Sequence, residues 1–536
     1  MENNNKYVDI PKEKFEFANT DEKITDKKFD TKPISYFKDA FIRFRKNKAS
    51  VVAAIIIILI VLFSFVVPVC TSNKKAQLMD IRYSKKGPRI ASLKYSIGLF
   101  DGGSSTPFSQ QEIIRELGKG VGAEFEEGKE TILIGDSLES YYQPIIKIKK
   151  VKFASQGKKQ LPNYDVRYDK YLSVGFIETD IEQSEYRKIL EWEQATGKKV
   201  LYPLIADNEY HFTEDANNVA NYWYKTTGRA IPVSTKSGRA VRLIDDSEYT
   251  VEDLLKVQLE DNYLRDADGN LVYWKYTGGG TDTTAQYTVR ILYYNYYQYL
   301  NGFEPNYLMG TDSQGYDLAY RLANGIKLSL LLAVCVSVIN FILGAIYGAI
   351  EGYYGGAVDI ILERISDILS GVPFIIVATL FQMHLSRKVG AVPSLIFAFV
   401  ITGWIGTASR VRTQFYRFKN QEYVMAARTL GASDRRIIWK HIFPNTLGTI
   451  ITSSALVIPS VIFSESMLSF LGIVNLGGSS MTSLGTLLSD ASKIWTLYPH
   501  LMIFPAVIIS LLMICFNLFG NGLRDAFNPT LRGVEE

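Results

Sequence analysis

The sequence predicts an α-helical membrane protein with six transmembrane helices and a large α+β domain inserted after the first helix. Six uncharged apolar runs divide the chain, and they span residues 49–73, 328–350, 368–386, 389–409, 441–464 and 494–523. Each run reaches the roughly 18–20 residues that a helix needs to cross the hydrocarbon core of a membrane. Because lipid offers no hydrogen-bonding partner for the backbone, we expect each run to form a helix. The polar residues 74–310 are long enough for one or two ordinary domains.

Composition excludes several classes of protein. The three cysteines, Cys70, Cys335 and Cys515, all lie in or beside apolar runs, so the polar region holds no disulfide framework and no CxxC metal pair. The net charge of +4 is too small to indicate a nucleic-acid partner. The first apolar run follows a long charged leader, which favours a membrane anchor over a secretory signal.

The distribution of basic residues predicts the orientation. Five basic residues precede the first run, and the loop 410–445 between the fourth and fifth runs carries eight basic residues against Glu422 and Asp434. Basic loops stay in the cytoplasm, so we expect both termini and the loop there and residues 74–310 outside. Two features oppose this assignment: Arg387 and Lys388 then lie outside, and the inner loop 351–367 is acidic.

We therefore divide the chain into four parts. Residues 1–48 form a polar cytoplasmic tail and a short helix in the headgroup layer, because Phe37, Phe41 and Phe44 repeat at helical spacing beside basic residues. A simple extension of the first span explains this helix equally well. Residues 49–73 form that span, 74–310 the inserted domain, and 311–532 the core with the remaining spans.

The inserted region has an α+β texture. Residues 145–153 alternate as a half-buried strand does, and Val272–Tyr276 follows a turn of the Asp-Gly-Asn type. Residues 181–195 have the spacing of a helix. The aromatic tract 289–299 is expected to form a domain core and an interfacial belt of tyrosines, with a ligand-stacking platform as the alternative.

The segment Glu422–Asn445, between the fourth and fifth runs, is amphipathic and basic. Its first half has a helical stripe that ends at Gly431, a C-cap residue. Ser433 is placed to cap a second helix, which would turn Ile437, Ile438 and Ile442 toward the membrane and stop at Pro444. Periodicity alone leaves an ordinary lipid-anchored loop as an equal alternative.

Motifs along the chain resemble one family. The pattern E-x3-A-A-x3-G from Glu422 to Gly431, with I-x-P at 442–444, resembles the EAA signature of ABC importer permeases. The sequences AARTLGAS and HIFPN are similar to those of the C-type subunit of the oligopeptide/dipeptide (nickel) permeases. Further matches lie at 35–48, 310–317, 352–356, 465–472 and 522–525, so the resemblance covers about 35–71 and 307–532. Position 316 departs from the family, with Tyr in place of Arg.

The resemblance implies a function. It implies a type I ABC importer permease fold in a bacterial cytoplasmic membrane, and a subunit that moves oligopeptides or dipeptides inward without hydrolysing ATP. The implied partners are a second permease, two ATPase subunits that bind ATP and Mg, and an extracytoplasmic substrate-binding lipoprotein. A nickel chelate or another small solute is an alternative cargo. A membrane-anchored receptor or enzyme that acts through residues 74–310 is a further alternative.

The resemblance also assigns roles to residues. The two short helices around Gly431 would be coupling helices that dock on an ATPase subunit, and residues 410–445 would form the coupling loop. The residues expected to make or support this contact are Glu422, Ala426, Ala427, Arg428, Gly431, Arg435, Ile442 and Pro444.

Polar residues in or beside the spans are candidates for the transport pathway or a gate: Asn340, Asp359, Asp367 and Glu465. Asp359, Glu363 and Asp367 are four residues apart, so they share one helix face. They are interpreted as a gate or brace for the coupling helices, or as acids favoured at a helix start beside Arg364, and the second interpretation is preferred. For Asn340 and Glu465, interhelical hydrogen bonding is the commoner outcome.

The sequence gives little support for catalysis. The four histidines form no HExxH motif and no cluster with cysteine, and His211 is alone in the inserted region. Gly128-Lys129 lacks the earlier glycine of a phosphate loop. Asp266-Ala-Asp268-Gly269 lacks the length and terminal Glu of a calcium loop, so we expect a hairpin turn there.

Overall fold

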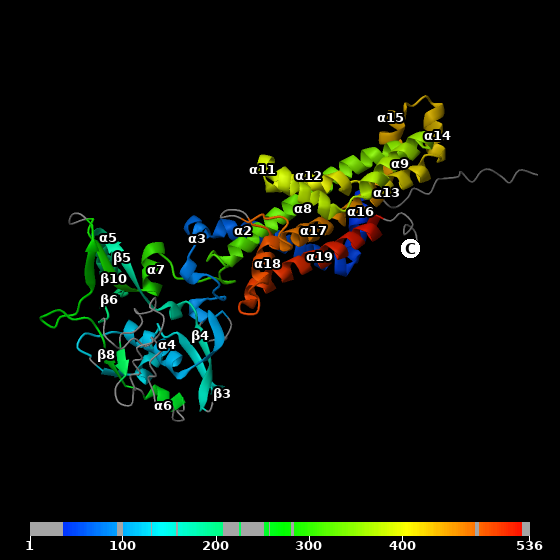
Figure 1. Ribbon diagram of the computed structural model, residues 1–536. Helices are drawn as coiled ribbons and strands as arrows, with labels where there is room; N and C mark the ends of the chain where they lie inside the picture. Colours follow the sequence, from blue (N-terminus) through cyan, green and yellow to red (C-terminus); the bar gives the residue numbers. More distant parts are fainter. Residues whose placement is uncertain are drawn as a thin grey trace, which may run out of the picture.

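A computed structural model describes residues 36–93, 100–129, 131–156, 159–206, 224–226, 251–256, 258–279, 284–477 and 482–527. The predicted tail 1–35 and His211 lie outside these residues. The strands gather at one end of an elongated molecule and a bundle of helices extends from them (Figure 1). We call the described residues within 94–300 the sheet domain.

The sheet domain is built from three antiparallel sheets. Their orders are β1-β4-β3, β5-β10-β6 with β9 also paired to β10, and β2-β8-β7. The strands are β1 (Gly103–Phe108), β2 (Thr131–Leu133), β3 (Ile145–Gln156), β4 (Lys159–Asp169), β5 (Phe176–Glu182), β6 (Leu201–Tyr202), β7 (Tyr224–Thr226), β8 (Gln258–Asp261), β9 (Trp274–Gly278) and β10 (Gln286–Leu292). The helices are α4 (Gln110–Ala123), α5 (Gln183–Thr196), α6 (Val251–Leu255) and α7 (Tyr293–Asn301).

Local sequence explains several of these elements. A capping box between Ser109 and Glu112 starts α4, which packs Ile113 and Leu117 against the first sheet. The predicted strand at 145–153 is β3, and the predicted helix at 181–195 is α5. The predicted turn is also present, because Asp266 accepts hydrogen bonds from the backbone of Asp268 and Asn270.

The aromatic tract 289–299 is divided between β10 and α7. Tyr293, Tyr294 and Tyr297 are buried, and Tyr293 and Tyr297 pack with Tyr83 and Tyr171 inside the molecule. The predicted domain core is therefore confirmed. The predicted interfacial belt is wrong for these three tyrosines, because the start of α7 turns them inward.

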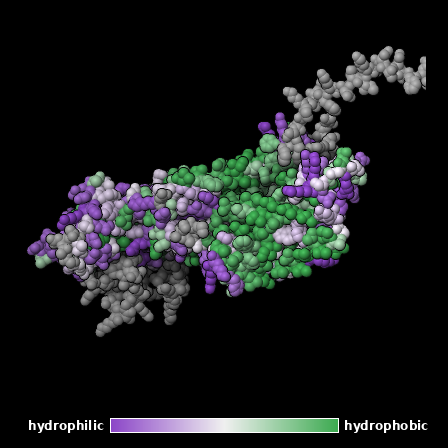
Figure 2. Space-filling view, turned by 90° about the horizontal axis from the view of Figure 1, so that it is seen from above, coloured by the Kyte–Doolittle hydropathy of each residue, from purple (hydrophilic) through white to green (hydrophobic). Residues whose placement is uncertain are grey.

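The bundle contains the apolar runs. Its helices are α1 (Tyr36–Lys46), α2 (Lys48–Cys70), α8 (Leu318–Tyr354), α9 (Gly356–Ser370), α10 (Phe374–His384), α11 (Ser386–Val389), α12 (Ala391–Gly403), α13 (Ile405–Phe418), α16 (Phe443–Ala455), α17 (Val457–Phe470), α18 (Leu484–Ser492) and α19 (Pro499–Phe527). Figure 2 shows an apolar surface over the bundle, with polar residues over the sheet domain and at the opposite end.

The number of spans differs from the expectation of six. Within the described residues, four helices are long and apolar enough to cross a membrane: α2, α8, residues 391–418 and α19. A fifth span requires the pair that ends in α17, which is bent by 45°. The run 368–386 instead contains the 11-residue α10, because Gly371 and Pro373 interrupt the helix before it. The count of six remains a prediction.

Two segments connect the bundle to the sheet domain, and we call residues 72–93 and 301–317 the neck. They contain α3 (Asn73–Gln77) and pair with each other, since Arg89 and Tyr307 exchange backbone hydrogen bonds of 2.8 and 3.0 Å. Gly315, at φ +92°, lies so close to the backbone of Asp80 that a side chain there would collide with it.

Candidate functional site at the far end of the bundle

The loop that carries the predicted coupling residues begins with a well-capped helix. α14 (Glu422–Thr429) ends at Gly431, which adopts φ +80°. The amide of Ala432 donates to Ala427 O and the amide of Gly431 to Arg428 O, each at 3.0 Å. This pair of hydrogen bonds is a Schellman motif and fixes the direction in which the chain leaves the helix. The predicted end of the first helix at Gly431 is confirmed.

The second half of the loop differs from its prediction. Ser433 precedes α15 (Asp434–Arg436), but its side chain makes no capping hydrogen bond. α15 continues into a π-helical segment, η7 (Ile437–Ile442), and then into α16. Pro444 does not stop the helix, because it lies in the first turn of α16, where no backbone N–H is needed. The loop is thus joined to the next span without a break.

The loop divides into an inner and an outer face. Val424, Ile437, Ile438 and Ile442 are buried in a common core, which also contains Tyr353, Val411 and Phe415 of the neighbouring helices. The three isoleucines were expected to face the membrane, and the structure instead buries them against neighbouring helices. Ala427 is buried too. Of the predicted coupling residues, those that remain exposed are Glu422, Ala426, Arg428, Gly431, Arg435 and Pro444.

The sequence analysis overlooked large apolar residues on the exposed face. Leu430 is 88% exposed at the tip of the loop, and Met425 and Trp439 are exposed as well. Met425 belongs to α14, and Figure 1 shows α14 and α15 at the end of the bundle away from the strands. The helical spacing of the first half places Leu430 on one side with Tyr423, Ala426 and Ala427, and of these four only Ala427 is buried.

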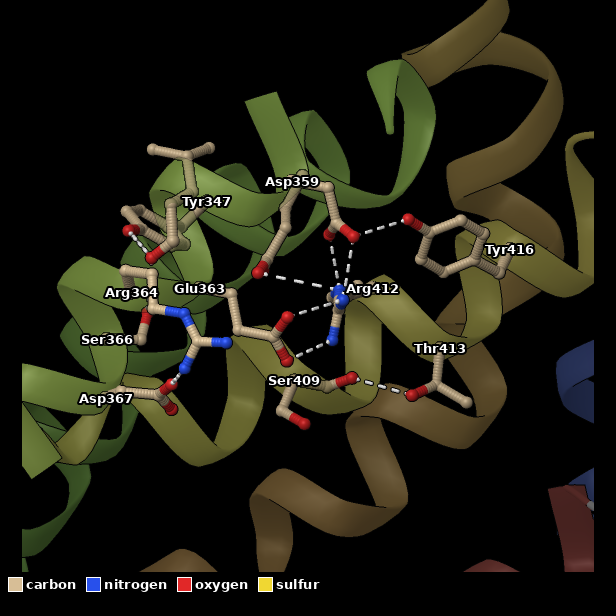
Figure 3. A network of polar contacts seen from close by, with 12 residues as sticks. Tyr347, Asp359, Glu363, Arg364, Ser366, Asp367, Ser409, Arg412, Thr413 and Tyr416 are labelled. Atoms are coloured by element: carbon tan, nitrogen blue, oxygen red, sulfur yellow. Dashed lines mark hydrogen bonds and ion pairs between the residues drawn. The ribbon is translucent and has the colours of Figure 1, made fainter. Parts of the chain in front are cut away.

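Arg412 of α13 lies at the centre of a polar network beside the loop (Figure 3). Its Nε and Nη2 donate to Asp359 at 2.6 and 2.8 Å, and its Nη1 and Nη2 donate to Glu363 at 2.8 and 3.0 Å. Glu351 at the end of α8 adds an ion pair of 3.5 Å. Tyr416 donates a further hydrogen bond of 2.8 Å to Asp359. One guanidinium therefore fastens α13 to both α8 and α9.

The predicted acidic face of α9 splits in two. Asp359 and Glu363 bind Arg412, whereas Asp367 pairs with Arg364 at 3.0 Å on an exposed surface (Figure 3). Asp359 lies in the first turn of α9, as the preferred interpretation expects, and Asp359 and Glu363 also brace α9 against α13 through Arg412. α9 is outside the spans, and the pKa of Asp359 lies below its ordinary value, first because Arg412 donates to it.

A row of glycines brings α8 and α13 together above this network. Added Cβ atoms on Gly344, Gly348 and Gly352 would collide with α13 or the residue before it, at Thr407, Ala408 and Phe415. The spacing of four residues places the glycines on one face of α8, so the two backbones approach closely. This approach brings Arg412 within reach of Glu351.

The last residues of α8 form ion pairs and hydrogen bonds with α13 and with the loop. Glu351 pairs with Arg412, and the carbonyl of Gly352 accepts a 3.0 Å hydrogen bond from Lys419 at the end of α13. Tyr353 Oη donates to Asp434 Oδ1 in the loop at 2.5 Å and accepts from Arg428 at 3.4 Å. The loop is therefore connected to α8 by hydrogen bonds as well as by its apolar core.

Asn340 and Glu465 lie apart from this network. Asn340 in α8 is buried against Gly403 of α12. Glu465 in α17 is buried and accepts hydrogen bonds from Ser329 and Ser469 at 2.9 and 3.0 Å. Glu465 therefore bonds to α8, and Asn340 packs against α12. Whether they take part in transport remains a prediction.

Some of the missed residues left a signal in the sequence. The repeat of glycine at 344, 348 and 352 marks a close helix contact and was available from spacing alone. Arg412 and Tyr353 left none, because their partners come from other helices. No group of acids, histidines and cysteines able to hold a metal ion occurs among the described residues.

Comparisons with known proteins relate the chain to transport permeases. Residues 344–533 match the family described as "Binding-protein-dependent transport system inner membrane component". Residues 35–88 match the "N-terminal TM domain of oligopeptide transport permease C". Residues 89–343 lie between these two matches and include the whole sheet domain.

Individual relatives are similar to part of the chain. It is 40% identical over 236 residues to the oligopeptide transport system permease protein OppC of Bacillus subtilis, a match that covers 44% of this chain and 76% of the relative. It is 40% identical over 229 residues to the dipeptide transport system permease protein DppC of the same organism, with 42% and 68% covered. The Haemophilus influenzae OppC is 42% identical over 230 residues, with 42% and 71% covered.

Among solved structures, a chain of the MetNI methionine ABC transporter in an inward-facing conformation matches with a TM-score of 0.33 and 16% identity. The match covers 39% of this chain and 97% of that chain.

Proposed function

Because this chain belongs to the family of oligopeptide and dipeptide transport permeases, we propose that it couples ATP hydrolysis in separate subunits to peptide movement through the loop Glu422–Asn445. It is a peptide-import permease subunit with the type I ABC permease fold and several membrane helices. Six spans, both termini in the cytoplasm and the sheet domain outside are the finer arrangement that we propose.

One observation carries the coupling proposal. The loop is fixed on one face and exposed on the other. A Schellman motif and a buried isoleucine cluster fix it to the bundle, while Leu430, Arg428 and Arg435 are exposed. An exposed leucine in a loop that also exposes arginines fits a partner with an apolar cleft bordered by acidic groups. We propose that this partner is an ATPase subunit that binds ATP and Mg.

The remaining partners are also proposed. A second, homologous permease would pair with this one, and a substrate-binding lipoprotein would deliver the peptide at the outer side. The sheet domain is placed to contact that lipoprotein or to wall the entrance, since it lies at the end of the bundle opposite the loop (Figure 1). Asn340, Asp359, Asp367 and Glu465 remain proposed pathway or gate residues.

Changing Leu430 tests the coupling proposal directly. Leu430→Asp places a charge where an apolar contact is proposed, and losing the burial of one leucine weakens binding by about 1.5–3 kcal/mol, or about 10–150-fold. We expect the variant to lose copurification of the ATPase subunits and uptake of a labelled dipeptide into proteoliposomes.

The matched control is Leu138→Asp, which changes another exposed leucine in the sheet domain. It is expected to copurify with the ATPase subunits as the parent protein does. If both variants copurify equally with the ATPase subunits, Leu430 does not contribute to the contact. Uptake of labelled nickel instead of peptide by the parent transporter would assign the alternative cargo.

A further inference from the structure

α8 is bonded to both ends of the molecule. It runs unbroken for 37 residues from Leu318 to Tyr354, which is about 55 Å at 1.5 Å per residue. The hydrocarbon core of a membrane is only about 30 Å thick, so α8 is long enough to extend beyond it. One end lies beside the coupling loop and the other enters the neck (Figure 1).

The neck end of α8 is held by charged groups. Asp317 caps the helix through Ala319 N and pairs with Lys75 at 3.4 Å. Lys75 also donates to the carbonyl of Asn306 at 2.6 Å. Arg321, one turn into the helix, pairs with Asp312 at 3.3 Å. Both neck segments are thereby attached to the first turn of α8. Tyr316, at the position that departs from the family, lies under the Arg321 guanidinium at 5.1 Å.

The neck itself leaves little freedom between α8 and the sheet domain. Lys85 N donates to Asp312 O at 2.8 Å, and Tyr293 of α7 donates to Asp80 at 2.7 Å. Five tyrosines from the neck and the sheet domain form one buried cluster: Tyr83, Tyr171, Tyr293, Tyr297 and Tyr307. Domains joined by a flexible linker move independently, whereas a packed and hydrogen-bonded junction of this kind transmits movement.

We propose that α8 joins the coupling loop and the sheet domain into one mechanical unit, so that the sheet domain moves when an ATPase partner displaces the loop. This inference rests on the proposed function. Tyr353 is the positioning residue at the loop end, because its hydroxyl bridges α8 to Asp434 and Arg428. The ion pairs of Lys75 and Arg321 are the corresponding attachment at the neck end. The inserted region is thus a moving part at the entrance for peptides.

Distances between spin labels test the proposal in the complete transporter with its ATPase subunits. The three native cysteines are replaced by serine, and labels are placed on Lys188 of α5 with either Lys327 of α8 or Lys388 of α11, all of which are exposed. On addition of a non-hydrolysable ATP analogue, we expect the 188–388 distance to shift and the 188–327 distance to stay constant.

A matched pair of variants identifies the route. Tyr353→Phe removes the hydroxyl that bonds the loop and is expected to lose most of the nucleotide-dependent shift. Tyr354→Phe removes a hydroxyl that makes no hydrogen bond within the described residues, and is expected to keep the full shift. Both keep the aromatic ring, so Tyr353→Phe retains the packing of the buried core, and Tyr354 is exposed.

Three outcomes would overturn the proposal. They are a change in the 188–327 distance, an unchanged 188–388 distance in a transporter that takes up peptide, and equal behaviour of the two tyrosine variants. Failure of the proposed function has a different signature: the ATPase subunits would then fail to copurify, or peptide uptake would be absent, before any distance is compared.

Discussion

At the scale of single residues, one arginine organises the end of the bundle beside the coupling loop. Arg412 faces three carboxylates from two helices, Glu351, Asp359 and Glu363. Its planar guanidinium binds the last two in a forked geometry that a lysine ammonium does not reproduce. The acids would repel one another without it, so we expect the arrangement of α8, α9 and α13 to depend on this side chain.

Replacing Arg412 by methionine keeps much of its volume and removes its charge. We expect the free energy of unfolding to fall by about 2–3 kcal/mol. This loss is smaller than that for breaking a fully buried ion pair, because the Arg412 side chain is 22% exposed. The thermal midpoint of the purified protein in detergent measures this loss. Arg412→Lys is expected to recover only part of it.

The control for that experiment is Arg417→Met, one turn further along the same helix. Arg417 is exposed and has no ion pair within the described residues, so its removal is expected to change stability by less than about 0.5 kcal/mol. A similar drop in the midpoint for both variants would show that the network contributes nothing specific.

At the scale of elements, the glycine row of α8 sets the distance to α13. Gly348→Ala places a methyl group against the carbonyl of Ala408, and overpacking of this kind costs about 1–3 kcal/mol. Gly406→Ala, in α13, meets nothing within 4 Å and replaces glycine in a helix, so it is expected to be neutral or slightly stabilising. Thermal midpoints of the two variants should therefore move apart, and a parallel decrease would contradict the close contact.

Element positions were predicted well where local sequence determines them. The end of α14 at Gly431 depends on one glycine, β3 depends on residue alternation, and α5 depends on helical spacing. The structure contains all three features. The stop at Pro444 failed because proline is equally suited to a first turn, and only the neighbouring π-helix η7 decides between the two.

Contacts between distant helices could not be predicted in this way. The pairing of Asp359 and Glu363 with Arg412 was not predicted, because Arg412 lies about fifty positions later in the chain and no local pattern connects them. The tyrosines of the tract 289–299 were expected to lie partly at a membrane surface, because the local sequence does not show which distant segments cover them. Their burial depends on neck segments from both ends of the inserted region.

At the scale of the whole molecule, an apolar belt separates two polar ends with different structures (Figure 2). One end presents a rigid loop with an exposed leucine, and the other carries the sheet domain on a hydrogen-bonded neck. α8 passes through the belt between them. In the mechanism that we propose, the coupling loop, the longest helix and the inserted region of the permease move together.

The central claim is that the geometry of the loop at Gly431 transmits force from an ATPase subunit to the bundle. ATP-dependent dipeptide uptake by the reconstituted transporter tests it, with Gly431→Val compared to Gly128→Val. Both glycines have positive φ, +80° and +90°, and no atoms within 4 Å of an added Cβ, so the two valines are matched in strain and space. The account predicts that Gly431→Val abolishes most uptake while Gly128→Val retains it. Normal uptake by an assembled transporter that carries Gly431→Val would contradict the account.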